Sequence, residues 1–135
     1  MSSNKKPKVE DIWFTQHCQQ RLRGRYPRAG IRGAQSIYND GMLLSADQAH
    51  TLMIRHPASM ETRQIKYVID AGLTGVFVLI AKYGELEGML PYSAVTFKRL
   101  TADQSELASQ ILGVEPRQPR SRQGETTEGE MSLSD

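Results

Sequence analysis

Apolar residues in the first third of the chain repeat at the spacing of an α-helix. Phe14, Cys18 and Leu22 stand four residues apart, so a helix would bury all three on one face. A threonine suited to the N-cap precedes Cys18 and a proline follows this run, which predicts a helix over residues 15–26. The same spacing predicts a second helix over residues 32–39, which ends at an Asn-Asp-Gly sequence.

The pattern becomes alternating after residue 41, which is typical of β-strands. Residues 42–44 and 50–55 are predicted to form a hairpin, and residues 65–69 a half-buried strand. Residues 76–81 form an uninterrupted apolar run between glycines, so we expect a central strand that is covered on both faces. Residues 89–97 predict one further strand. Because the links between these runs are short, an antiparallel meander is favoured.

A last helix is predicted after the strands. Thr101 and Gln104 have the spacing of a capping box, and Gly113 is a typical C-terminal stop. The predicted fold class is therefore α+β, with two N-terminal helices packed on an antiparallel meander of four to five strands, followed by a C-terminal helix. We expect the helices to pack on one face of the sheet.

The length of 135 residues fits a single domain with a modest core. Residues 1–9 are polar and lysine-rich, and residues 114–135 have very few apolar side chains, so both are predicted to be disordered and residues 10–113 to form the domain. The longest apolar run, at residues 76–81, is too short for a membrane span, and Cys18 is the only cysteine. Both features favour a soluble protein of the reducing cytoplasm.

Positive charge is concentrated in the first quarter of the chain. Residues 1–33 contain eight lysines and arginines against two acidic residues, although the net charge of the whole chain is only +2. Such an imbalance is typical of a surface that meets phosphates or an acidic partner. The alternative is a basic face that contacts only solvent.

The residues that best match a chemical site lie on the first predicted helix. His17, Arg21 and Arg25 are spaced four residues apart and would form one stripe beside the buried face. A histidine with arginines suits a scissile phosphate, because His exchanges protons near neutral pH and Arg binds phosphate oxygens in pairs. Lys82 and Tyr92, at strand ends, could face this helix across a cleft. The alternatives are a merely basic helix flank and amphipathic residues at the sheet margin.

Other reactive residue types have simpler interpretations. His50 and His56 would share one strand face, but their Cα atoms would stand about 20 Å apart, too far for one metal ion. Cys18 lies on the apolar stripe of the first helix, so we expect a buried structural thiol rather than a nucleophile. No metal site is predicted.

The order of these features resembles a family of small bacterial domains that occur on plasmids and phages. The sequence Phe-Thr-Gln-His-Cys-Gln-Gln-Arg at residues 14–21, followed by Arg25, a second helix at residues 31–41 and a strand meander, is similar to the RelE-like ribonuclease toxins of the broader barnase–colicin-type superfamily. The resemblance covers residues 12–98. It departs at Cys18, where the family commonly has alanine.

The resemblance implies a metal-independent endoribonuclease without a cofactor. Its substrate would be RNA, which could be ribosome-associated, and a cognate antitoxin or another protein would control it. His17 would be the general acid or base, and Arg21 and Arg25 would hold the phosphate. Lys82 and Tyr92 would contribute from the sheet. The RNA-binding residues would be Arg25 together with Arg23, Arg28 and Arg32.

The alternative function is a non-catalytic accessory protein of a phage or plasmid with the same fold. Such a protein would dock on nucleic acid or on a protein through its basic first quarter, and an antitoxin or immunity partner is a third interpretation. The enzyme and the binding protein differ in whether His17 and Arg21 meet Lys82 or Tyr92 in one concave site, because an acid and a base must reach the same substrate.

Overall fold

The protein has a mixed α+β fold with a five-stranded sheet. The computed structural model describes residues 5–55, 62–82 and 92–117, with the backbone alone for residues 62–64 and 82. Along the chain the elements are the 3-10 helix η1 (Val9–Asp11), β1 (Ile12–Phe14), α1 (Gln16–Arg23), α2 (Ile31–Asp40), β2 (Met42–Leu44), α3 (Ala46–Thr51), β3 (Thr62–Ile69), β4 (Gly75–Lys82), β5 (Tyr92–Arg99) and α4 (Ala102–Leu112).

The strand order across the sheet is β1-β5-β4-β3-β2. β4 is the central strand, as predicted from its apolar run, and its antiparallel pairing with β3 and β5 confirms the meander. The sheet is not wholly antiparallel, because β1 pairs in parallel with the start of β5. The prediction missed β1 since its partner lies far away in the sequence, and a three-residue strand leaves no periodic pattern of its own.

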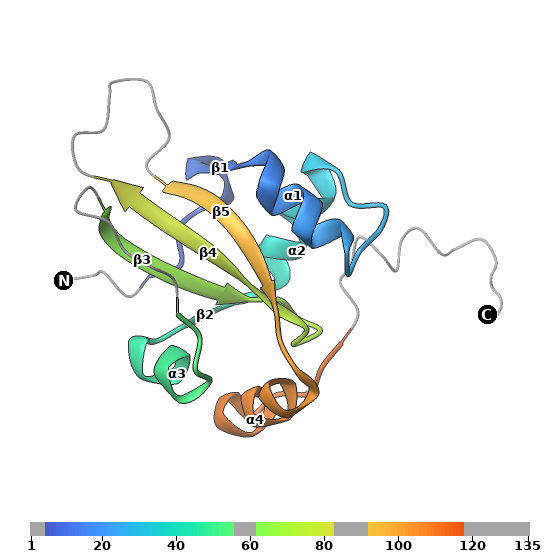
Figure 1. The fold of residues 1–135 in the computed structure, drawn as a ribbon, viewed down its shortest axis with the longest axis vertical. Helices are drawn as coiled ribbons and strands as arrows, with labels where there is room; N and C mark the ends of the chain where they lie inside the picture. Colours follow the sequence, from blue (N-terminus) through green and yellow to red (C-terminus); the bar gives the residue numbers. More distant parts are fainter. Residues whose placement is uncertain (1–4, 56–61, 83–91, 118–135) are drawn as a thin grey trace, which may run out of the picture.

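Helices cover both faces of the sheet, and the prediction of a single covered face is wrong. Figure 1 shows α1 and α2 on one side of the strands and α3 and α4 on the other. Neighbouring residues of β4 enter different cores: Phe77 packs with residues of α1 and α2, whereas Val76 packs with residues of α3 and α4. A strand that is apolar at every position needs cover on both faces, which a one-sided arrangement does not provide.

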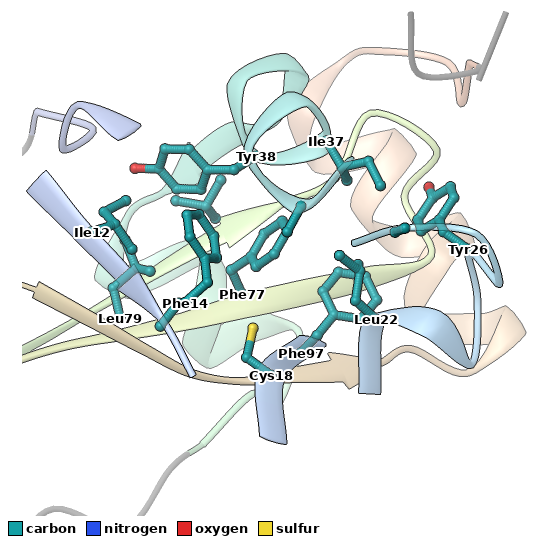
Figure 2. Packing of buried hydrophobic residues seen from close by; sticks show 14 residues of the cluster. Ile12, Phe14, Cys18, Leu22, Tyr26, Ile37, Tyr38, Phe77, Leu79 and Phe97 are labelled. Carbon is teal, nitrogen blue, oxygen red and sulfur yellow. The ribbon is translucent and has the colours of Figure 1, made fainter. Parts of the chain in front are cut away.

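The core beneath α1 and α2 is built around four aromatic rings, which we call the aromatic core. Phe77 lies at its centre, with ring centroids 5.0 Å from Phe97, 5.7 Å from Tyr38 and 6.0 Å from Phe14. All three contacts are edge-to-face, which suits the opposite charges of ring faces and ring edges. Figure 2 shows these rings together, with the Cys18 sulfur pointing into the cluster.

The predicted hairpin of residues 42–44 and 50–55 is wrong in its second half. β2 is a strand, but residues 46–51 form the short helix α3. The side chain of Ser45 accepts from the backbone N–H of Gln48, and the Gln48 side chain accepts from the N–H of Ser45. This capping box has the same spacing as the one that correctly predicted α4, so the missed signal was present in the sequence.

The described ends of the chain contact the folded domain. The Lys6 ammonium donates to the carbonyls of Tyr38, Asn39 and Gly41, where α2 ends. At the other end, the backbone N–H of Arg117 donates to the carbonyl of Ala71. The described parts of the segments predicted to be a leader and a tail therefore contact the domain, whereas residues 1–4 and 118–135 lie outside the described residues.

A buried carboxylate joins the chain beyond α1 to the turn between β3 and β4. Asp70 is completely buried and accepts from the Tyr26 hydroxyl, from the Thr74 hydroxyl at 2.6 Å and from the backbone N–H groups of Thr74 and Gly75 at 2.7 and 3.1 Å. Burial raises the pKa of Tyr26, and the negative charge of Asp70 raises it further. Because its pKa is raised, the Tyr26 hydroxyl keeps its proton and remains a donor to this carboxylate.

Replacing Tyr26 with phenylalanine should destabilise the fold more than the same change at Tyr38. The Tyr26 hydroxyl donates to a carboxylate, whereas the Tyr38 hydroxyl donates to the Pro7 carbonyl. Hydrogen bonds to charged groups contribute about 1.5–3 kcal/mol and neutral ones about 1 kcal/mol. Urea unfolding of both variants measures the difference, and equal losses would contradict the importance of the Asp70 carboxylate.

Candidate functional site

A groove runs between α1 and the second half of β5. Its volume is about 490 Å³, and its lining residues are Gln20, Arg21, Gly24, Thr96, Phe97, Lys98 and Arg99. Figure 1 shows α1 lying alongside β5. The Thr15 hydroxyl donates to the Ala94 carbonyl at one end, and the Arg99 guanidinium donates to the Gly24 carbonyl at 3.5 Å at the other. We call this feature the α1–β5 groove.

The groove exists because β1 is shorter than β5. β1 pairs only with residues 92–94 of β5, and within the described residues no other strand pairs with this edge. A β-bulge at Val95 also shifts the register, since Val78 pairs with Thr96 and Leu79 with Ala94. Bulges bend a strand and redirect its side chains. The chain leaves β1 at Thr15 and forms α1, which lies beside the remaining part of the edge.

The N-terminus of α1 forms as the sequence predicts. Thr15 is its N-cap, and the Thr15 hydroxyl accepts from the backbone N–H of Cys18 at 3.1 Å. The helix ends at Arg23 rather than Tyr26, because the chain tightens at Gly24, whose N–H bonds to the carbonyl of Arg21. Glycine favours helices poorly, and this residue outweighed the proline three positions later as the helix stop.

The lining of the α1–β5 groove is strongly positive. Arg21 comes from α1, and Lys98 and Arg99 come from β5, with no acidic residue in the described lining. Lys98 donates to the Arg55 carbonyl at 2.6 Å, and Arg99 donates to Gly24. An ammonium has three N–H donors and a guanidinium five, so each side chain can bond to an anion as well. Paired oxygen acceptors such as phosphates match the guanidinium groups best.

The predicted stripe of His17, Arg21 and Arg25 extends only to Arg21. His17 and Arg21 are both exposed and lie one turn apart on α1. Arg25 lies beyond the end of the helix, with its guanidinium 5.0 Å from the centre of the Tyr26 ring. The prediction placed Arg25 in the stripe because it carried the helix through Gly24, whereas α1 ends at Arg23.

The residues predicted to contribute from the sheet lie at the other end of it. Gly75, the first residue of β4, pairs with Arg99 beside the groove. Lys82 is the last residue of β4, and an extended strand places it about 23 Å from Gly75. Tyr92 pairs with Ile12 and has the Lys66 ammonium 5.8 Å from its ring centre. The structure therefore does not bring Lys82 or Tyr92 to Arg21, and the Lys82 side chain lies outside the described residues.

The other predicted RNA-binding arginines do not line the groove. Arg23 donates to the carbonyl of Ala29, and Arg28 and Arg32 are exposed around the start of α2. The sequence analysis did not identify Lys98 and Arg99 as site residues, because they lie far along the chain from the basic first quarter. A signal was present, because these two cations follow Phe97 directly at the end of a strand pattern.

The remaining predictions concerned metal-binding residues and membrane spans. Among these residues there is no group of three or more His, Cys, Asp or Glu placed to hold a metal ion. His50 is exposed on α3, and His56 lies outside the described residues. In the same part of the chain no helix has the length and apolar character needed to cross a membrane.

Comparison with known proteins leaves the family of this chain open. No family model matches it, and neither the curated proteins nor the solved structures contain a significant match. The resemblance to RelE-like toxins therefore stays an expectation from the sequence, and functional inference rests on the geometry of the α1–β5 groove.

The thiol of Cys18 should react only when the protein unfolds. Its side chain is completely buried, and burial raises its pKa to about 12, so very little thiolate is present at pH 8. Ellman's reagent should label the denatured protein within minutes and the native protein at a far lower rate. Rapid labelling of the native protein would contradict the structural role of Cys18.

The same pKa shift predicts that stability falls at alkaline pH. The unfolded thiol loses its proton near pH 8.5, whereas the folded thiol keeps it until about pH 12. Between these values the folded state binds more protons, so the free energy of unfolding decreases as the pH rises. Urea unfolding between pH 8 and 10 measures this slope, and Cys18→Ala should have a shallower one.

Proposed function

We propose that this protein is a non-catalytic nucleic-acid-binding protein that holds phosphates in the α1–β5 groove. The observation that supports the proposal is the convergence of Arg21, Lys98 and Arg99 from two elements on one hollow without an acidic residue in its described lining. Cations in a concave surface raise the local concentration of anions and can neutralise several neighbouring phosphates.

The composition of the groove favours nucleic acid over an acidic protein. Protein interfaces have apolar centres where charged residues are depleted, and large aromatic or aliphatic side chains provide most of the binding energy. Phe97 is the only large apolar residue in the described lining of the groove, and it is only 1% exposed because it belongs to the aromatic core. The accessible groups are cations and the neutral polar side chains of Gln20 and Thr96, which suit a phosphate backbone.

Ribonuclease activity stays a prediction. Catalysis by general acid and base requires both groups within hydrogen-bond reach of one substrate. Arg21 lines the groove with Lys98 and Arg99, while Tyr92 lies beside Lys66 near the start of β5. This separation favours a binding protein over an enzyme. A cytoplasmic location and a cognate antitoxin also stay predictions.

Removing two groove charges should weaken nucleic-acid binding and its dependence on salt. The test variant is Arg21→Gln/Arg99→Gln, and fluorescence anisotropy with a labelled oligonucleotide measures its affinity between 50 and 300 mM salt. Each lost phosphate contact should reduce the slope of log K against log salt concentration by about 0.7 to 0.9. The double variant should therefore bind several-fold more weakly at low salt and lose between about 1.4 and 1.8 of the slope.

The matched control is Arg28→Gln/Arg32→Gln, which removes the same charge from exposed arginines outside the groove. It should bind almost as well as the wild type. Equal losses in both double variants would show that only net charge matters and would overturn the groove as the binding site.

An incubation with total RNA in the presence of a chelator tests the enzymatic alternative. The proposed binding protein should leave the RNA intact. Cleavage by the wild type that is lost in His17→Ala would instead establish the ribonuclease, with His17 in its active site.

A further inference from the structure

The single tryptophan of this chain is exposed on an edge strand. Trp13 is the middle residue of β1, and 63% of its surface is accessible to solvent, although both of its neighbours in the strand are buried. Tryptophan is usually highly buried, and its large flat ring is a common contact surface. The exposed indole on β1, the strand next to β5, is therefore available to contact a ligand.

Strand register places Trp13 on the same face of the sheet as Thr96 and Lys98. Trp13 pairs with Ser93, which in turn pairs with Ile80 of β4. Further along the same two strands, Thr96 pairs with Val78 and Lys98 with Val76. Paired residues share a face and alternate residues of β4 return to it, so Trp13, Thr96 and Lys98 lie on one face, the one that Val76 shares with α3 and α4. Arg99 pairs with Gly75 and therefore lies on the opposite face, with Phe97 and α1.

The distance between the indole and the cations suits a short stretch of an extended chain. Trp13 lies in register with Ile80 of β4, through Ser93, and Lys98 lies in register with Val76. These two residues of β4 are four positions apart, which is about 13 Å along the strand. The open edge of β5 connects the two positions, and Arg99 and Arg21 line the groove at this edge from the opposite face of the sheet. A ligand that follows this edge would meet a flat apolar ring first and positive charges next.

We propose that Trp13 and the α1–β5 groove together bind single-stranded nucleic acid. A base stacks on the indole of Trp13, and the phosphates of neighbouring nucleotides bind Lys98, Arg99 and Arg21. In a duplex the bases are already stacked and paired, so an indole on a protein surface reaches the face of a base only in a single strand. Aromatic side chains interleaved with cations are the usual means of binding single strands without sequence preference. This inference rests on the proposed function and names the class of nucleic acid.

The intrinsic fluorescence of the protein reports on this contact directly. Trp13 is the only tryptophan, so a change in tryptophan emission comes from this position alone. The full chain is titrated with unlabelled single-stranded DNA, single-stranded RNA and duplex DNA of about ten nucleotides or base pairs. We expect saturable quenching by a single strand, with the same Kd that anisotropy gives, and little quenching by the duplex.

The variant Trp13→Ala tests the energetic contribution of stacking. Its affinity for a single strand should fall by about 5- to 140-fold, and its affinity for duplex DNA should hardly change. Trp13→Phe should recover part of the loss, because a smaller ring still stacks. Ile31→Ala is the matched control, since Ile31 is an exposed apolar residue on α2 and does not line the groove. Because Trp13 is largely exposed, urea unfolding should show that Trp13→Ala is folded.

The outcomes separate this inference from the proposed function. If Arg21→Gln/Arg99→Gln weakens binding but Trp13→Ala does not, and single strands leave the emission unchanged, the stacking role is overturned while the groove stays a phosphate site. Equal quenching by the duplex would overturn the selectivity for single strands. If Arg21→Gln/Arg99→Gln binds like the wild type, the proposed function fails, and this inference fails with it.

Discussion

The buried carboxylate of Asp70 is the contact on which the arrangement of the molecule depends. A carboxylate without access to water is stable only when donors surround it, and here those donors come from the Tyr26 hydroxyl and from the β3–β4 turn. Tyr26 lies just beyond α1, so this contact joins the end of that helix to the end of the sheet at the β3–β4 turn. The position of α1 over the sheet, and with it one wall of the α1–β5 groove, follows from this link.

The two cores explain why the α1–β5 groove lies at the edge of β5 rather than on a face of the sheet. Phe77 and Phe97 place the aromatic core beneath α1 and α2, and the neighbouring residues of the strands face α3 and α4. With both faces covered, the edges of the sheet are the remaining places where polar backbone meets solvent. β1 pairs with only the first three residues of β5, and α1 lies beside the rest without pairing with it.

The proposed chemistry depends on residues that are far apart in the sequence. Arg21 belongs to a helix near the N-terminus, and Lys98 and Arg99 end the last strand. Their like charges repel one another, which is a cost to stability that a bound anion would remove. Trp13 adds an apolar contact on the same edge and leaves its own surface exposed, as an unoccupied binding surface requires. The edge thus combines the two kinds of contact that a single strand offers, bases and phosphates.

Local chemistry in the sequence determined most of the individual elements. The Thr15 cap, the apolar run of β4, and the Thr101 capping box with Gly113 at φ +68° all act over a few residues, so their patterns predicted structure directly. The α3 capping box was equally local, and its misreading as a strand came from an alternating pattern. Only the tertiary structure decided that β1 pairs in parallel with β5, that helices cover both faces, and that Arg21, Lys98 and Arg99 line one groove while Tyr92 and Lys82 lie elsewhere. These features arise from contacts between distant segments, and no periodicity along the chain records which of those segments will meet.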